Sequence, residues 1–320
     1  MKIAISGGTG FIGKALSVHL ANKGHTVYIL TRKHNEASKN KNIQYIKWSA
    51  NDQTFPFEAI DAFINLAGEP INSGRWTKRK KEQIITSRLE TTQGILKQIS
   101  FLAKRPQVFI NASAIGYYGA SQTDTFTEQH LKHGTDFLAT TVVKWEDEAR
   151  KAEELGIRTV LARFGIVLGK EGGALPKIVF PYKLFIGGTV GSGRQWVSWV
   201  HIDDVAKMIA FALETPAISG PLNITAPHPV TMKEFGKLVA KVLGKPHWLP
   251  IPSFVLRIVL GEMSTLVLDG QRVLPAKAMH NGYEHSYPNL EKAFTTILTY
   301  SERSLPLQSC EGRSPTIRGR

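Results

Sequence analysis

The sequence of 320 residues contains one cysteine, Cys310, which leaves no partner for an internal disulfide and no cysteine cluster for a metal ion. A single cysteine is typical of proteins from reducing compartments. The ten histidines show no metal-ligand spacing either. We therefore expect no metal site and a cytoplasmic location.

Long hydrophobic runs are also missing. The most apolar stretch, residues 254–268, is interrupted by Arg257 and Glu262 and is too short to cross a bilayer as a helix. The first residues run straight into a glycine-rich turn, without the charged and apolar regions of a signal peptide. We expect neither a membrane span nor secretion by a signal peptide.

Acidic residues are scarce relative to basic ones, 26 against 40, which gives a formal net charge of +14. Such an excess of basic residues can favour binding to nucleic acid, to an anionic membrane or to an anionic small molecule. The densest basic runs, residues 33–47 and 75–81, lack the interleaved aromatic residues of a single-strand binder. We interpret them as solvated surface, expect no nucleic-acid partner, and assign part of the excess to a phosphate-rich cofactor.

Short β-branched runs alternate with longer amphipathic stretches up to residue 165. The expected strands are residues 2–6, 26–30, 43–48, 62–66, 107–112 and 159–163, and the clearest helices are 13–23, 80–104 and 137–155. Alternation of this kind indicates a parallel sheet flanked by helices. The predicted fold class is α/β, a Rossmann-type doubly wound parallel sheet.

Glycine and proline become frequent after residue 165, which predicts loops and short elements. We expect a Rossmann domain over residues 1–165 and a smaller α/β substrate lobe over 166–300. Residues 196–222 are expected to return to the first domain, because 196–213 has the pattern of a strand and a helix of its sheet. Residues 301–320 are rich in Ser, Arg, Gly and Pro, and we expect a disordered tail.

The strongest motif is Gly7-x-x-Gly10-x-x-Gly13, directly after the first strand and before the first helix. Gly7 permits a sharp turn, Gly10 lets the backbone approach a pyrophosphate, and Gly13 lets the helix pack closely on the sheet. The alternative is a merely tight turn, but the strand-loop-helix context favours a dinucleotide. The expected cofactor contacts here are Gly7, Thr9, Gly10, Phe11, Ile12 and Gly13.

The second strand ends without the Asp or Glu that an NAD site places against the ribose 2′-hydroxyl. Thr31 and Arg32 stand there instead. A hydroxyl and a guanidinium suit a 2′-phosphate, so this feature favours NADP over NAD. The alternative is a surface arginine after a strand. Lys33 either assists or is a solvated lysine.

Several segments resemble the extended short-chain dehydrogenase/reductases of the NAD(P)-dependent epimerase/dehydratase family. They are the glycine motif, Asn65-Leu66-Ala67-Gly68, Ser113 followed by Tyr117-Tyr118-Gly119, Arg163-Phe164-Gly165, the His201-x-Asp203-Asp204 segment and Leu222-Asn223-Ile224. The resemblance spans about residues 1–300. Closer likeness, in residues 66–71, 75–77, 87–88 and 261–275, is to atypical members, the YfhF/YfcH-like epimerase-family proteins.

The resemblance implies reversible hydride transfer by an oxidoreductase or a nucleotide-sugar-type epimerase, without naming a substrate. It also implies that Leu66, Ala67 and Gly68 lie beside the cofactor and that Ser113 contacts substrate or nicotinamide. His201 and Asp203 look like architecture that pins a loop. A homodimer is one arrangement open to such a chain.

The chain departs from that family in its catalytic pair. Typical members carry Tyr-x-x-x-Lys on the long helix after the fifth strand, whereas the spacing here is Thr140-x-x-x-Lys144. An aliphatic hydroxyl is far less acidic than a phenol, so Thr140 cannot replace the tyrosine. Lys144 either reaches the nicotinamide ribose or is an exposed helix lysine.

A proton carrier would therefore come from elsewhere near Ser113. Glu69 fits that role if it is partly buried, and the alternative is a solvated or salt-bridged residue. Tyr117 and Tyr118 are further candidates, with a structural role as the alternative. Arg88 either holds an anionic substrate group or pairs with Glu82 or Glu90. Loss of the Tyr-Lys pair keeps a second hypothesis open, a non-catalytic NADP(H)-binding sensor or scaffold.

Overall fold

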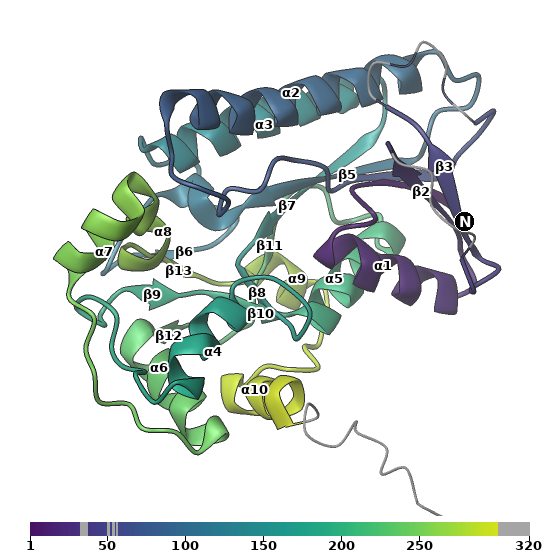
Figure 1. Ribbon diagram of the computed structural model, residues 1–320. Helices are drawn as coiled ribbons and strands as arrows, with labels where there is room; N and C mark the ends of the chain where they lie inside the picture. Colours follow the sequence, from purple (N-terminus) through teal and green to yellow (C-terminus); the bar gives the residue numbers. More distant parts are fainter. Residues whose placement is uncertain (33–37, 50–51, 53–54, 56, 300–320) are drawn as a thin grey trace, which may run out of the picture.

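The computed structural model describes residues 1–32, 38–49, 52, 55 and 57–299 (Figure 1). Lys33, Cys310 and the tail expected at residues 301–320 lie outside this part of the chain.

A seven-stranded parallel sheet forms the centre of the molecule. Its strands are ordered β11-β7-β5-β4-β1-β2-β3. The chain winds outward from β1 through β2 and β3, then crosses to β4 on the other side, so the order reverses between β1 and β4. The strands are β1 (Lys2–Ser6), β2 (Thr26–Thr31), β3 (Ile43–Lys47), β4 (Ala62–Asn65), β5 (Val108–Ala114), β7 (Arg158–Phe164) and β11 (Gly220–Ile224). The predicted Rossmann fold class is confirmed.

Helices cover both faces of this sheet, α2 (Lys78–Ser100) and α3 (Phe137–Glu154) on one and α1 (Phe11–Asn22) and α5 (Ile202–Glu214) on the other (Figure 1). Because successive strand residues point to opposite faces, Ile3 and Ile5 pack with α1 and α5 while Ala4 faces α2 and α3. Burial on both faces accounts for the nearly continuous apolar strands.

One expected strand is not in the main sheet. Residues 196–201 form β9 (Trp196–Val197), paired with β12 (Val230–Thr231), and β10 (Trp199–His201), paired with β8 (Ile166–Leu168). The expectation that residues 196–201 form a strand of the main sheet is wrong. The chain turns away after β7 at Gly165, where an added Cβ would lie 2.4 Å from the Ser198 carbonyl oxygen. The following helix α5 and strand β11 do lie with the main sheet.

A second core lies below the sheet, where α4 (Leu175–Lys183), α6 (Met232–Leu243) and α10 (Leu290–Thr299) pack around Trp199, Phe235 and Phe294. The shorter elements are η1 (Ile115–Tyr118), β6 (Thr125–Phe126), α7 (Ser253–Leu260), η2 (Gly261–Ser264), α8 (Thr265–Leu268), β13 (Arg272–Val273) and α9 (Ala276–His280). Buried Asp204 accepts hydrogen bonds from the Tyr283 hydroxyl and from two backbone amides of residues 286–287. Asp204 thereby fixes the segment that leads into α10.

Candidate functional site

The glycine loop lies at the carboxyl end of β1, beside the reversal of strand order. Gly7 has a φ of +73°, and an added Cβ would lie 2.7 Å from the Leu66 carbonyl carbon. At Gly13 an added Cβ would lie 2.4 Å from the Gly7 carbonyl oxygen. Close approach of backbone therefore requires glycine at both positions. The loop is held against the end of β4 on one side and the start of α1 on the other.

Gly10 is different, because an added Cβ would meet only the Gly7 carbonyl oxygen, at 3.2 Å. Gly10 and Thr9 are exposed. Gly10 is the N-cap of α1, and neither a side-chain cap nor an acidic residue satisfies the first turn. Within the described residues, the first turn of α1 therefore has backbone N–H groups without a hydrogen-bond acceptor at the positive end of the helix dipole, as an anion site requires.

The side chains of Phe11 and Ile12 pack on the core rather than facing outward. An added Cβ at Gly172 would lie 2.7 Å from the Phe11 ring, so this ring joins α1 to the loop before α4. Any cofactor contact from Phe11 and Ile12 would thus come from their backbone.

A buried polar network fixes the carboxyl end of β4. The Asn65 side chain accepts from Ser6 Oγ at 2.6 Å and donates to Asn111 Oδ1 at 2.7 Å and to Thr92 Oγ1 at 3.1 Å. Asn65 Oδ1 also accepts from the Ala67 amide at 3.2 Å. Three strands and α2 are locked together at this edge, so Leu66, Ala67 and Gly68 form a defined wall beside the glycine loop.

Thr31 ends β2 and Arg32 follows it, with Thr31 half-buried and Arg32 exposed. Strand β2 neighbours β1 in register, with Ser6 opposite Leu30. Arg32 therefore stands at the same edge of the sheet as the glycine loop, on the β2 side.

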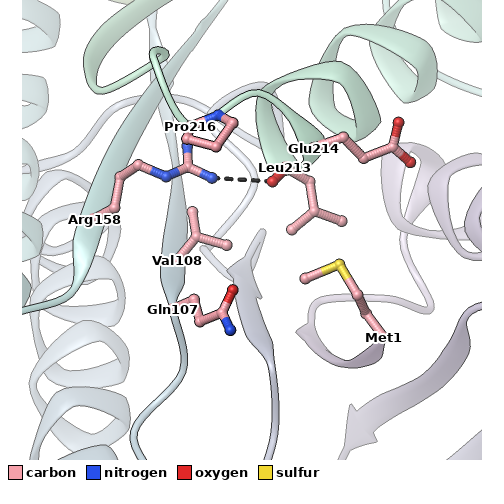
Figure 2. A pocket seen from close by; sticks show the side chains of 7 residues that line it. All are labelled: Met1, Gln107, Val108, Arg158, Leu213, Glu214 and Pro216. Carbon is pink, nitrogen blue, oxygen red and sulfur yellow. Dashed lines mark hydrogen bonds between the residues drawn. The ribbon is translucent and has the colours of Figure 1, made fainter.

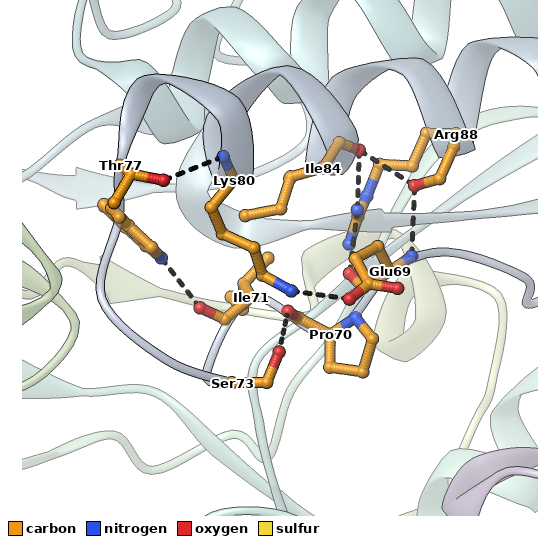
Figure 3. A network of polar contacts seen from close by, with 10 residues as sticks. Glu69, Pro70, Ile71, Ser73, Thr77, Lys80, Ile84 and Arg88 are labelled. Carbon is orange, nitrogen blue, oxygen red and sulfur yellow. Dashed lines mark hydrogen bonds and ion pairs between the residues drawn. The ribbon is translucent and has the colours of Figure 1, made fainter.

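Figure 3 shows that Glu69 is held by an ion pair, with Lys80 Nζ 2.5 Å from Glu69 Oε1. The Glu69 side chain is 41% exposed. The residue as a whole is partly buried, which was the condition for Glu69 as a general acid or base, and it is also salt-bridged, as in the alternative. A catalytic role of Glu69 stays a prediction.

Arg88 is half-buried and forms no ion pair with Glu82 or Glu90. Its Nη1 donates to the carbonyl oxygens of Glu69, at 3.0 Å, and Ile84, at 2.9 Å (Figure 3). Burial lowers the pKa of Arg88 to about 10, against an opposing effect of the Glu69 charge. The guanidinium also supports Gly68, where an added Cβ would lie 3.3 Å from Arg88 Cζ. Arg88 thus stabilises the turn after β4 through its contacts with Gly68 and Glu69.

The helix positions of the usual catalytic pair lie on the exposed part of α3. The Thr140 hydroxyl donates to the Asp136 carbonyl oxygen at 2.8 Å, and both Thr140 and Lys144 are exposed. Lys144 is two residues before buried Glu146, a rotation of about 200° around the helix. Lys144 therefore lies on a different side of α3 from Glu146, and its contact with the cofactor stays a prediction.

Ser113 belongs to a buried cluster that sequence reasoning missed. Its Oγ donates to Glu146 Oε1 at 2.5 Å. Glu146 also receives a two-pronged contact from Arg163, with Nε 2.8 Å from Oε1 and Nη2 2.7 Å from Oε2. All three side chains are buried. The signals were present as an arginine inside apolar β7 and a glutamate on the buried face of α3, since buried charges require partners.

Tyr117 and Tyr118 enclose the Arg163 guanidinium. The Tyr117 ring centroid lies 3.5 Å from Arg163 Cζ, and that of Tyr118 lies 5.0 Å away. The hydroxyl groups are occupied, Tyr117 donating to the Leu131 carbonyl oxygen at 3.0 Å and Tyr118 to Asn223 Oδ1 at 2.8 Å. Burial raises the pKa of Tyr118. These contacts match the structural alternative for both tyrosines.

His201 ends β10 and caps α5, because its Nδ1 accepts from the Asp203 amide at 3.1 Å. Its ring stacks on Tyr287 with centroids 3.8 Å apart. Both contacts are architectural.

Two cavities lie away from this site. One, of about 510 Å³, is at the amino ends of β5 and β7, where Arg158 donates to carbonyl oxygens at the end of α5 (Figure 2). The other, of about 1000 Å³, lies between α2 and α3. Neither is lined by the glycine loop or Ser113. Within the described residues no helix is long and apolar enough to cross a membrane, and no group of His, Cys, Asp and Glu could hold a metal ion.

Comparisons with known proteins agree with this architecture. The model of the NAD dependent epimerase/dehydratase family matches residues 3–224, and a domain of unknown function, DUF1731, matches residues 251–297. The chain is 48% identical over 302 residues to the epimerase family protein YfhF of Bacillus subtilis, covering 93% of this chain and 98% of that protein.

Solved structures give the same result. The human epimerase family protein SDR39U1, crystallised with NADPH, is 35% identical and superposes with a TM-score of 0.84 over 93% of this chain and 99% of that one. A nucleoside-diphosphate sugar epimerase from Corynebacterium glutamicum is 29% identical, with a TM-score of 0.75 over 94% of this chain and 58% of that one. The resemblance seen in the sequence is confirmed, and the chain belongs to the NAD-dependent epimerase/dehydratase family.

Proposed function

We propose that this protein binds NADP(H) at the carboxyl edge of the sheet and acts as an oxidoreductase or nucleotide-sugar-type epimerase. The observation that carries the proposal is the glycine loop: Gly7 and Gly13 are enclosed by backbone, while the Cβ position of Gly10 opens toward space beside an uncapped helix start. A cradle that a side chain would fill suits a pyrophosphate.

The remaining cofactor contacts follow from the same edge. In the proposal, Thr9, Gly10 and the amides of Phe11, Ile12 and Gly13 hold the pyrophosphate, and residues 66–68 line the ribose. Thr31 and Arg32 hold the 2′-phosphate, because a guanidinium binds a phosphate group better than the Asp or Glu of an NAD site would. The human neighbour was crystallised with NADPH, which supports the proposed preference of this chain for NADP(H). We give Lys144 no part in the proposed site, because it lies about 200° around α3 from Glu146, the residue of that helix that reaches Ser113.

Bound nicotinamide would supply the hydride acceptor or donor at its C4 atom. Around it, the protein would orient the substrate and hold a proton at Ser113. Of the expected catalytic residues, Ser113 is the one whose hydroxyl donates to a buried carboxylate, that of Glu146. Glu69 is paired with Lys80, and both tyrosine hydroxyls have other partners.

A second function remains an alternative, because Thr140 occupies the position of the family's catalytic tyrosine. A non-catalytic NADP(H) sensor or scaffold would bind the cofactor without turnover. The test combines calorimetry with NADPH and absorbance at the nicotinamide band over a panel of secondary alcohols, ketones and nucleotide sugars. Turnover on any of these supports the enzyme, cofactor binding without turnover supports the sensor, and absence of cofactor binding contradicts both.

A further inference from the structure

Large apolar side chains are exposed together at one end of the C-terminal lobe. They are Phe180, Leu184, Phe185, Ile186, Trp248 and Leu249, and we call them the lobe patch. Phe180 lies in the last turn of α4, and residues 184–186 follow that helix directly. The segment after α6 joins them, because the Trp248 indole N–H donates to the Phe185 carbonyl oxygen at 2.9 Å. The lobe patch is therefore one surface, built on the elements below the main sheet in Figure 1.

Phe185 is held in a backbone conformation that normally belongs to glycine. Its φ is +62°, and it is the one residue other than glycine with a positive φ in the described part of the chain. Helix α4 ends here in a Schellman motif. The Phe185 amide donates to the Tyr182 carbonyl oxygen, and the next amide donates to that of Pro181, both at 3.0 Å. Glycine is the usual residue at this position, and a bulky side chain is strained there.

Core packing does not offset this strain. The Phe185 side chain is 54% exposed and belongs to none of the buried apolar clusters. Its ring is covered in part by Lys245, whose Nζ lies 3.9 Å from the ring centroid. A strained residue kept at an exposed position points to a role at the surface rather than in folding.

The two segments that carry the lobe patch are basic. Residues 174–188 and 235–253 contain no Asp or Glu, and their lysines are Lys177, Lys183, Lys237, Lys241 and Lys245. Within the described residues, Lys241 is the one of these that forms an ion pair, with Glu291 of α10. Lys183 is exposed and directly precedes Leu184 of the patch. Apolar side chains bordered by lysines complement a surface that is apolar and anionic.

We propose that the lobe patch is a docking surface for an anionic lipid membrane. Phe185 and Trp248 would enter the boundary between headgroups and acyl chains, where aromatic side chains are favoured. The lysines would remain at the level of the anionic headgroups, with their aliphatic stems along the apolar surface. Such contact is peripheral and needs no spanning helix. It goes beyond the proposed function and does not depend on the cofactor site.

A membrane fits this surface better than an acidic protein does. Protein interfaces carry direct hydrogen bonds between the partners. The polar groups of the patch are already bonded within the chain, since the Trp248 indole donates to Phe185 and the Trp248 amide donates to the Gly187 carbonyl oxygen at 3.0 Å. What the patch offers outward is apolar side chains and flexible lysines, which a bilayer can accept without matching geometry.

Co-sedimentation of the full chain with lipid vesicles tests the proposal. One vesicle is phosphatidylcholine alone, and the other contains phosphatidylglycerol as about one third of the lipid. Wild type should bind the anionic vesicles and not the neutral ones, and added salt should weaken binding. Phe185→Gly should weaken binding by about tenfold, because an apolar ring no longer enters the bilayer. Its melting temperature should stay close to that of wild type or rise, since glycine relieves the strain.

Charge and position are tested by two further variants. Lys183→Gln should weaken binding to the anionic vesicles by about fivefold, the contribution of one lysine near such a surface. Phe101→Ala is the matched control, because Phe101 is a 75% exposed aromatic residue at the end of α2, across the main sheet, and it should bind like wild type.

Wild type that binds neither vesicle, or binds both equally, would overturn the proposal. Unchanged binding in Phe185→Gly would do the same, because the strained ring would then have no part in it. Self-association of the free chain that Phe185→Gly abolishes, without vesicle binding, would assign the lobe patch to a second copy of the chain instead.

Discussion

Ser113 on β5 and Arg163 on β7 lie opposite each other in register, and both side chains reach the same carboxylate oxygen of Glu146. The pairing joins two strands and a helix near the carboxyl ends of β5 and β7. A buried ion pair is costly to break from one side only, because the remaining charge is left unpaired.

Removing one partner of this pair should therefore destabilise the fold. Arg163→Leu leaves Glu146 buried without its cation and should lower the free energy of unfolding by about 3–5 kcal/mol. Urea denaturation followed by circular dichroism measures the change. Lys241→Ala, which breaks the surface pair with Glu291, serves as the control and should change the midpoint little. Equal effects of the two substitutions would contradict the account.

Acid should weaken the fold through His201. Burial lowers the pKa of His201 below its ordinary value of 6.5, against opposing charges of Asp203 and Asp204. The unfolded chain then binds the proton more readily than the native one, so stability rises with pH through the window below 6.5 and is lost as pH falls through it.

Replacing His201 checks the sign of this pH dependence. His201→Asn keeps an N-cap acceptor for α5 and should flatten the slope, which is at most about 1.4 kcal/mol per pH unit for one proton. Thermal unfolding between mildly acidic and neutral pH measures it. The exposed His280 provides the control variant His280→Asn, which should retain the wild-type slope. An unchanged slope in His201→Asn would show that other groups set it.

Lys144 tests whether the usual lysine position still serves the cofactor. Because it faces solvent on the side of α3 away from Glu146, Lys144→Ala should leave the NADPH dissociation constant within about twofold of wild type. Fluorescence titration of NADPH suffices for the measurement. A loss of tenfold or more would return the lysine to the site.

Arg32 tests the choice between cofactors. Arg32→Ala should weaken NADPH binding by about 10- to 100-fold and leave NADH binding nearly unchanged, since only the contact to the 2′-phosphate is lost. Competition titrations with both dinucleotides measure the two affinities. Equal affinities of wild type for NADPH and NADH would contradict the NADP assignment.

The fold was largely predictable because its signals are local. Strand β1 was predicted with the bounds that the structure shows, and α3 to within one residue, because the spacing of their apolar residues marks both elements. The prediction for residues 196–201 was wrong because β10 pairs with β8 instead of with a strand of the main sheet. No local pattern in the sequence distinguishes a strand of that small sheet from an edge strand of the large one.

The proposed site was predictable only in part. The glycine loop can be recognised from the sequence, because the close backbone contacts at Gly7 and Gly13 admit only glycine. The Ser113, Glu146 and Arg163 cluster depends on contacts between residues 17 to 33 positions apart in sequence, which charge and burial patterns suggest but do not pair. The sequence left both interpretations of Glu69 open for the same reason, because its partner Lys80 comes from the next helix.

The central claim is that the loop of Gly7, Gly10 and Gly13 holds a dinucleotide, and calorimetry of NADPH with wild type and Gly10→Val tests it most directly. An added Cβ at Gly10 would lie 3.2 Å from the Gly7 carbonyl oxygen, and the rest of the valine side chain would take up space beside the α1 N-terminus that the pyrophosphate needs. We predict saturable NADPH binding to wild type and none to a folded Gly10→Val protein, with circular dichroism and the melting temperature confirming the fold. Wild-type affinity in the folded variant would contradict the account.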